Sequence, residues 1–172
     1  SSWTFDLMFG LPSQTVAGWH EDLARAIDLG APHLSVYALT VEPRTRLAWQ
    51  ISRGDVELPG DDAQTEMMFV ARELLQAAGY THYEVSSYAQ PGHRAVHNSG
   101  YWAMVPYLGL GAGAHGFVEP RRWVNVRRPS RYIEAALGGD ATASEEHVPE
   151  ETLDFERVMT GLRDLERGVD IT

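Results

Sequence analysis

Residues 3–41 contain three segments in which apolar side chains recur at regular intervals. Residues 3–10 alternate, with apolar side chains at positions 5, 7 and 9 and polar ones at 4 and 6, as in a β-strand. Val16–Leu29 has the apolar spacing of an α-helix, with Thr15 before it as an N-cap and Gly30 and Pro32 after it. His33–Val41 is nearly continuously apolar, which is typical of a strand covered on both faces. This order predicts a βαβ unit with adjacent parallel strands and the helix packed on their outer face.

Beyond residue 43 the pattern is less regular. Asp61 and Gln64 have the spacing of a capping box, which predicts a helix from Asp61 to Ala78 that buries Met68, Ala71 and Leu75. We expect the remaining segments to be an irregular polar connection over Pro43–Gly60, a short strand over His82–Tyr88, a basic turn over Pro120–Pro129, a helix from its cap Ser130 to Leu137, an acidic linker over Asp140–Glu151, and an amphipathic helix that begins at Pro149.

The segment Pro91–Gly116 shows neither a helical nor a strand period. It holds three histidines, three aromatic residues and six glycines. Imidazole can ligate a transition metal or exchange a proton near neutral pH, and Tyr101 and Trp102 offer flat apolar faces that suit a planar ligand. Because no helical pattern follows its glycines, the segment is not a dinucleotide-binding loop. From the residues alone, a ligand-binding segment and an ordered surface loop with packing aromatics explain it equally well.

Composition and charge narrow the class of protein. The chain has 172 residues, 44% of them hydrophobic and 22% charged, as in ordinary globular proteins. A net charge of −10 argues against a general nucleic-acid-binding surface, which is basic. No apolar run approaches the length of a membrane span and no signal peptide opens the chain. Without cysteine there is neither a disulfide nor a thiolate metal site, and a cytoplasmic location is the default expectation.

Asp6 is a lone carboxylate within the otherwise apolar first strand. An exposed edge position or a structural hydrogen bond is the ordinary explanation, because an unpaired buried carboxylate is unfavourable. In parallel sheets and barrels, ligands bind at the carboxyl ends of strands, which here are Phe9–Leu11 and Leu39–Glu42. Asp6 is therefore the first candidate in the chain for contact with a ligand.

Five segments together resemble one protein family. They are DLMFGLPSQT (Asp6–Thr15), LSVYALTVEP (Leu34–Pro43), AAGYTHYEVSSYA (Ala77–Ala89), HNSGYW (His97–Trp102) and YLGLGAGAHG (Tyr107–Gly116). In this order they resemble the HemN/HemW branch of the radical S-adenosylmethionine (SAM) proteins, which comprises oxygen-independent coproporphyrinogen III oxidases and related heme chaperones. The resemblance extends over nearly the whole chain, so it is more specific than any single motif.

The resemblance implies an α/β fold. Residues 1–118 would form the C-terminal part of a (βα)6 partial barrel with its closing loop, 119–148 a connection, and 149–172 the start of a helical C-terminal domain. Family members bind a 4Fe–4S cluster through a C-x3-C-x2-C loop on the first barrel strand, and this chain has no cysteine. We therefore expect a piece of a longer parent, with the cluster in the parent only and no radical chemistry from the piece alone.

The resemblance also implies site residues. Asp6 would contact SAM through its carboxylate, and Thr40 and His115 through their backbones. His97, in a motif associated with the chaperone-like members, would be the heme-iron ligand. His97 also stands next to Asn98, an amide that can orient it, and close to the aromatic surface of Tyr101 and Trp102; His93 and His115 are its rivals.

Three functional hypotheses remain. The first is a heme chaperone that binds heme and delivers it to acceptor proteins. The second is a coproporphyrinogen oxidase of porphyrin biosynthesis, and the third is a non-catalytic piece. HNSGYW favours the first over the second, and the lack of cysteine favours the third for this chain by itself. The expected partners are heme or porphyrin and heme-acceptor proteins, without nucleic acid, and peripheral contact with a membrane stays open.

Overall fold

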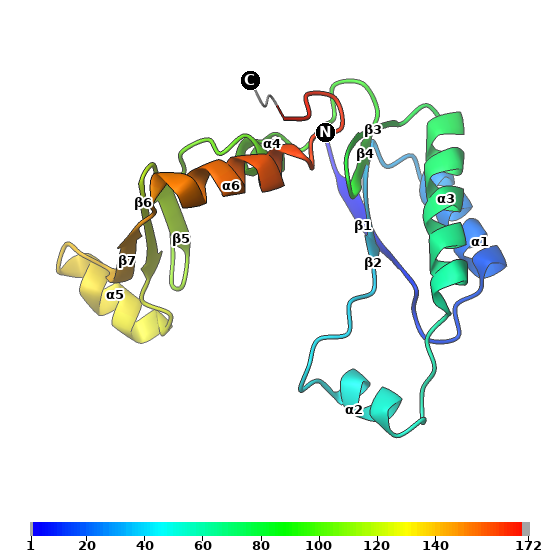
Figure 1. Ribbon diagram of the computed structural model, residues 1–172, viewed down its shortest axis with the longest axis horizontal. Helices are drawn as coiled ribbons and strands as arrows, with labels where there is room; N and C mark the ends of the chain where they lie inside the picture. Colours follow the sequence, from blue (N-terminus) through cyan, green and yellow to red (C-terminus); the bar gives the residue numbers. More distant parts are fainter. Residues whose placement is uncertain (1, 170–172) are drawn as a thin grey trace. The chain divides into compact units, whose positions relative to one another are not determined.

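The structure, a computed structural model, describes residues 2–169 and divides into two compact units (Figure 1). The first unit ends at Ala95 and the second begins at Val96. The domain limits after residues 118 and 148 that the family resemblance implies stay a prediction. Among the described residues, no helix is long and apolar enough to cross a membrane.

The first unit is built on a four-stranded sheet. Its strands are β1 (Thr4–Phe9), β2 (His33–Ala38), β3 (Thr81–Glu84) and β4 (Ser87–Ala89), in the spatial order β1-β2-β4-β3. β1 and β2 are parallel and adjacent, which confirms the predicted pairing. β2 ends at Ala38, short of the expected Val41. β4 pairs antiparallel with both β2 and β3.

Two helices, α1 (Val16–Asp28) and α3 (Asp61–Ala77), lie side by side on one face of this sheet (Figure 1). They bury the largest cluster of apolar side chains in the described chain, which includes Trp19, Leu23, Leu34, Met67 and Leu75. The indole Nε1 of Trp19 donates to the backbone oxygen of Met67 at 2.9 Å, so the ring is buried without losing its hydrogen bond. Thr15 caps α1 as predicted, because its Oγ1 accepts from the Gly18 backbone N–H at 3.0 Å.

Sequence predictions of three kinds in this unit are wrong. No capping box opens α3: its N-cap is Gly60, and Gln64 instead donates to the Pro59 carbonyl at 2.8 Å. The methionine that α3 buries is Met67, while Met68 is 48% exposed. The third error is in segment type, since Pro43–Gly60 contains a helix, α2 (Arg46–Ser52), and His82–Tyr88 lies in the β3–β4 hairpin.

Local chemistry explains both of these missed elements. Thr45 caps α2 by accepting from the Ala48 backbone N–H at 3.2 Å, but the helix itself is short and buries no residue fully. The hairpin turns at Val85-Ser86 without glycine or proline, the residues that usually signal a turn. The Glu84 carboxylate accepts from the Ser86 backbone N–H at 3.1 Å and so takes their place.

The second unit, over residues 96–169, contains a three-stranded antiparallel sheet and three helices (Figure 1). The strands, β5 (His115–Val118), β6 (Arg121–Asn125) and β7 (Thr142–His147), lie in the order β5-β6-β7. The helices are α4 (Val96–Trp102), α5 (Pro129–Leu137) and α6 (Glu150–Gly161). Its buried apolar cluster is small, formed by Phe117, Val148 and Leu153 with Met104 and Tyr107 packed against it.

Several predictions for this region are also wrong. The unpatterned segment contains α4, the basic turn contains β6, and the acidic linker contains β7. β7 has almost no apolar side chain that could reveal it, and its pairing with β6 is instead marked by the cross-strand ion pairs Arg121–Glu145 and Arg122–Glu146. Ser130 does not cap α5: Arg128 occupies that position, and Pro129 begins the helix.

Candidate functional site

The face of the first sheet that α1 and α3 leave uncovered is polar. Leu34 and Val36 of β2 belong to the apolar cluster, so the alternate residues His33 and Ser35 lie on the other face. There the two ring nitrogens of the buried His33 contact the Thr4 hydroxyl and the Tyr83 hydroxyl, each at 2.8 Å. Burial lowers the pKa of His33, and the nearby carboxylates of Asp6 and Glu84 only partly oppose this shift. A neutral imidazole therefore links three strands.

Asp6 lies on this polar face in the middle of β1, opposite Ser35. Its side chain is exposed, and within residues 2–169 its carboxylate accepts no hydrogen bond and forms no ion pair. Thr40 is exposed two residues beyond the end of β2, where the Leu39 backbone N–H donates to the Phe9 carbonyl at 2.8 Å. Asp6 thus lies within β1 and Thr40 follows the end of the neighbouring strand β2, and both can offer polar atoms to a ligand.

In the second unit, HNSGYW forms most of α4. Residues on one side of this helix and the chain that follows it enclose a groove of about 180 Å³. The groove is lined by Val96, His97, Gly100, Tyr101, Val105, Pro106 and Tyr107. The His97 imidazole is exposed and lies edge-on to the Tyr101 ring, with ring centres 4.7 Å apart and an interplanar angle of 77°. The groove is therefore apolar with one imidazole at its wall.

The end of α4 produces the second wall of the groove. The Met104 N–H donates to the Tyr101 carbonyl at 3.0 Å, and the Val105 N–H donates to the Gly100 carbonyl at 2.9 Å. Met104 has a φ of 51°, in the left-handed region. These are the two hydrogen bonds and the backbone conformation of a Schellman motif. Through this motif the chain reverses direction, which brings Val105 and Pro106 beside the helix.

A series of aromatic contacts connects the His97 imidazole, through Tyr101 and Tyr107, to the buried Phe117. The Tyr101 ring meets the Tyr107 ring edge-on at 4.6 Å, and Tyr107 lies 6.3 Å from the buried Phe117. Burial raises the pKa of the Tyr107 hydroxyl, and Tyr101 adds to the shift. The phenol is thus protonated at neutral pH and is a poorer metal ligand than the neighbouring imidazole.

Trp102 and Asn98 are placed elsewhere on the same helix. Trp102 lines a second cavity of about 180 Å³ between α4 and α6, together with Met104, Arg122 and Glu156. The guanidinium of Arg163 lies 4.2 Å from the centre of the Trp102 ring. Asn98 is exposed and lines neither cavity. Of the four candidate heme-binding residues, the structure brings His97 and Tyr101 together at one groove.

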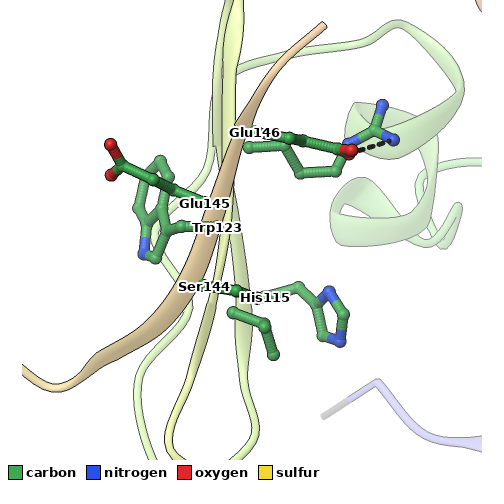
Figure 2. Close-up of a pocket in the computed structure, with 7 residues that line it drawn as sticks. His115, Trp123, Ser144, Glu145 and Glu146 are labelled. Carbon is green, nitrogen blue, oxygen red and sulfur yellow. Dashed lines mark hydrogen bonds and ion pairs between the residues drawn. The ribbon is translucent and has the colours of Figure 1, made fainter.

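His115, the first residue of β5, lies in a hollow of about 440 Å³ beside the second sheet (Figure 2). Figure 2 shows His115 and Glu146 on one side of the sheet and Trp123 and Glu145 on the other. Glu146 pairs with Arg122 at 3.3 Å. The hollow therefore combines an exposed imidazole with a charged pair, which suits a polar ligand.

The glycines before and within β5 are explained by packing within the protein. A Cβ on Gly109 would lie 2.1 Å from the His115 carbonyl oxygen, and one on Gly116 would lie 2.1 Å from the Trp123 indole. The buried Asn125 side chain donates to the carbonyls of Gly109 and Gly111 at 3.0 and 3.1 Å. The high density of glycine lets this loop fold closely against β5 and β6.

The chain is similar to curated proteins over nearly its whole length. It is 37% identical over 166 residues to the heme chaperone HemW of Synechocystis, covering 94% of this chain and 40% of that protein. It is 43% identical over 151 residues to HemW of Escherichia coli, covering 82% of this chain and 39% of that protein. It is also 37% identical over 126 residues to zebrafish radical S-adenosyl methionine domain-containing protein 1, mitochondrial, covering 73% and 28%. No protein-family model matches the chain.

A solved structure agrees in fold. Coproporphyrinogen III oxidase (HemN) from Escherichia coli, described as a radical SAM enzyme, matches 95% of this chain and 41% of its own length with a TM-score of 0.72. The chain belongs to the HemN/HemW branch of the radical SAM proteins. Its fold is accordingly the α/β fold of that branch, as the sequence predicts, although the identity to HemN is only 17%. The chain spans about two fifths of the length of the HemW proteins it matches.

Sequence reasoning missed part of the groove in this family member. The sequence prediction does not single out Gly100 and Val105, because it treats the segment that forms α4 as irregular. One signal was available, since Val96, His97, Gly100 and Tyr101 have the spacing of one helical face. The turn that brings Val105 beside them depends on a methionine in a left-handed conformation, which no sequence pattern indicates.

Proposed function

We propose that the protein containing this chain binds heme and delivers it to acceptor proteins, and that His97 is the iron ligand. The observation that carries the proposal is the position of His97 in the α4 groove. An exposed imidazole stands at the wall of an apolar cavity and is held edge-on by Tyr101. The HemW proteins that match the chain are named heme chaperones, and this groove has the chemistry such a ligand requires.

The groove fits heme in its donor and in its lining. Heme iron accepts an imidazole nitrogen as an axial ligand, and His97 offers one that is accessible to solvent. The other lining residues are apolar or aromatic and suit contact with a flat macrocycle. With a volume of about 180 Å³ the groove would hold one edge of the macrocycle and leave the rest exposed. Partial exposure is compatible with transfer to another protein.

SAM contacts are a second part of the proposal. The Asp6 carboxylate would accept hydrogen bonds from the ligand, and Thr40 would contact the ligand through its backbone. The backbone contact of His115, which lies in the second unit, stays a prediction from the family resemblance. This is supported by the exposure of Asp6 and the lack of a protein partner for its carboxylate within residues 2–169. The 4Fe–4S cluster would be held by the longer parent, because this chain has no cysteine to ligate it.

The oxidase alternative is less well supported. Its basis is a likeness in fold to HemN at 17% identity, and a fold supports many functions. The matches at higher sequence identity bear the chaperone name.

Hemin titration of the full chain, followed through the Soret band, tests the proposal. In His97→Ala, loss of the axial ligand should weaken hemin binding by about tenfold or more, which is on the order of 1.4 kcal/mol. The same substitution should shift the Soret maximum. His20→Ala is the matched control, since His20 is an exposed imidazole on α1. An unchanged spectrum and affinity for His97→Ala, or no binding by the unaltered chain, would remove the groove as the heme site.

A further inference from the structure

Gly100 is a helical glycine whose presence the protein's own packing does not explain. The described chain contains three glycines inside helices, at positions 18, 100 and 161. A Cβ on Gly18 would lie 3.3 Å from the capping hydroxyl of Thr15, and one on Gly161 would lie 2.9 Å from Val169. A Cβ on Gly100 would meet only the Val105 Cβ, at 3.9 Å, which is an ordinary contact.

The folded chain should in fact prefer a larger residue at this position. Glycine is a poor helix former, and Gly100 has no positive φ that would require it. In a Schellman motif the third residue from the end of the helix commonly makes an apolar contact with the second residue beyond the C-cap. Here these two positions are Gly100 and Val105. An alanine methyl at 3.9 Å from Val105 would supply that contact.

The absence of a side chain at Gly100 leaves open the part of the groove that lies beside His97. Gly100 follows His97 by three residues, so the two lie on neighbouring turns of one helical face. Both line the α4 groove. A flat ligand that occupied the groove with its iron bound to His97 would lie against the rest of the lining, which includes Gly100 one turn further along α4. A side chain at residue 100 would stand in that space.

We infer that Gly100 is a specificity-determining residue, which keeps the α4 backbone open so that the tetrapyrrole ring can lie against it beside His97. This inference rests on the proposed heme-binding function and adds to it a contact with the ring. His97 would bind the iron. The open surface at Gly100 would contact the macrocycle, and this contact does not depend on the iron.

Two ligands and two substitutions separate these roles. The probes are hemin and metal-free protoporphyrin IX, each titrated against the full chain. Gly100→Leu places a bulky side chain in the groove. It should weaken the binding of both ligands by about tenfold or more, because the side chain overpacks a formed site. Gly100→Ala should weaken both by a smaller factor and raise the thermal unfolding midpoint. His97→Ala should weaken hemin far more than protoporphyrin.

Ala103→Leu is the control, because it adds the same kind of side chain just beyond α4 at an exposed residue outside the groove. It should leave both affinities unchanged. Unfolding midpoints show whether a loss of binding follows a loss of folding. If the unaltered chain binds hemin through His97 and Gly100→Leu binds both ligands normally, the inference about Gly100 is wrong and the proposed function stands. If no ligand binds, or His97→Ala has no effect, both are overturned.

Discussion

The two units of this chain are stabilised in different ways. The first has an extensive apolar cluster in which two helices cover a sheet, with Leu23, Leu34, Met67 and Leu75 fully buried. The described part of the second buries three apolar residues, and ion pairs join its strands to each other and to α6. An apolar core appears in the sequence as a periodic pattern, whereas a framework of ion pairs does not. The same difference should appear in their response to substitution.

Truncation of a core leucine should have the largest effect and should differ between the units. Leu23→Ala should lower the free energy of unfolding by about 3–5 kcal/mol, because its dense surroundings cannot collapse into the cavity. Leu153→Ala, at an equally buried position in a smaller cluster, should lower it by less. Urea denaturation measures both changes. Leu29→Ala, at a residue 64% exposed, is the control, and equal losses for Leu23 and Leu153 would contradict the comparison.

Removal of Arg122 tests the ion-pair framework. Its guanidinium pairs with Glu146 of β7 and Glu156 of α6, and both it and Glu156 are largely shielded from water. Arg122→Met should lower the free energy of unfolding by about 1.5–3 kcal/mol, as loss of partly buried charged hydrogen bonds does. Arg131→Met removes the exposed pair with Glu134 and should change it by less than about 0.5 kcal/mol. Similar values for the two variants would mean that charge does not hold the second sheet together.

The buried His33 should make the first unit sensitive to acid. Burial lowers the pKa of its ring in the folded state, so below the ordinary pKa of about 6.5 the unfolded chain takes up a proton first. Stability is therefore complete above that pH and falls as the pH decreases through the interval between the two pKa values. One group contributes a slope of at most about 1.4 kcal/mol per pH unit.

Urea denaturation of the unaltered chain and of His33→Gln between pH 7 and pH 5 measures the contribution of His33. The difference between their slopes isolates this residue from the exposed carboxylates that titrate in both proteins. Parallel curves would show that the His33 ring is not kept neutral by burial.

Helix caps should give the smallest effects. Thr15→Ala removes the side-chain cap of α1 and should cost about 1 kcal/mol of stability. Ser130→Ala should change the free energy of unfolding by less than about 0.5 kcal/mol, because Ser130 makes no capping hydrogen bond in α5. Circular dichroism during thermal unfolding measures both. A loss at Ser130 that matched the loss at Thr15 would restore the capping role that the sequence predicts.

The sequence predicts a large part of the first unit. Alternation in β1, the helical spacing of α1 and its Thr15 cap all reflect burial against one core, and the structure confirms them. The pattern does not show the β3–β4 hairpin, whose turn is formed by a carboxylate instead of glycine. It also misidentifies the buried methionine of α3, because two adjacent methionines offer the same apolar signal at different angles.

Prediction in the second unit is limited by polar strands. β7 is exposed along nearly its full length. Its side chains pair with β6 through ion pairs between residues that are 24 positions apart in the sequence. His97 and Tyr101 could be singled out by chemistry, but their common groove depends on α4 and its left-handed Met104. Local pattern therefore identifies the candidate side chains, and the three-dimensional arrangement shows which of them lie together.

β1 lies at the end of its sheet order, so among the described residues one of its edges has no strand beside it. Such an edge is a template for self-association, and a charged side chain within an edge strand is one means by which proteins prevent it. Asp6 is an exposed charge of this kind, next to a hollow of about 310 Å³ lined by Phe5–Met8 and one side of α1. Neutralising Asp6 to test ligand contact would thus also remove a barrier to aggregation, and the solubility of that variant decides how its binding data are interpreted.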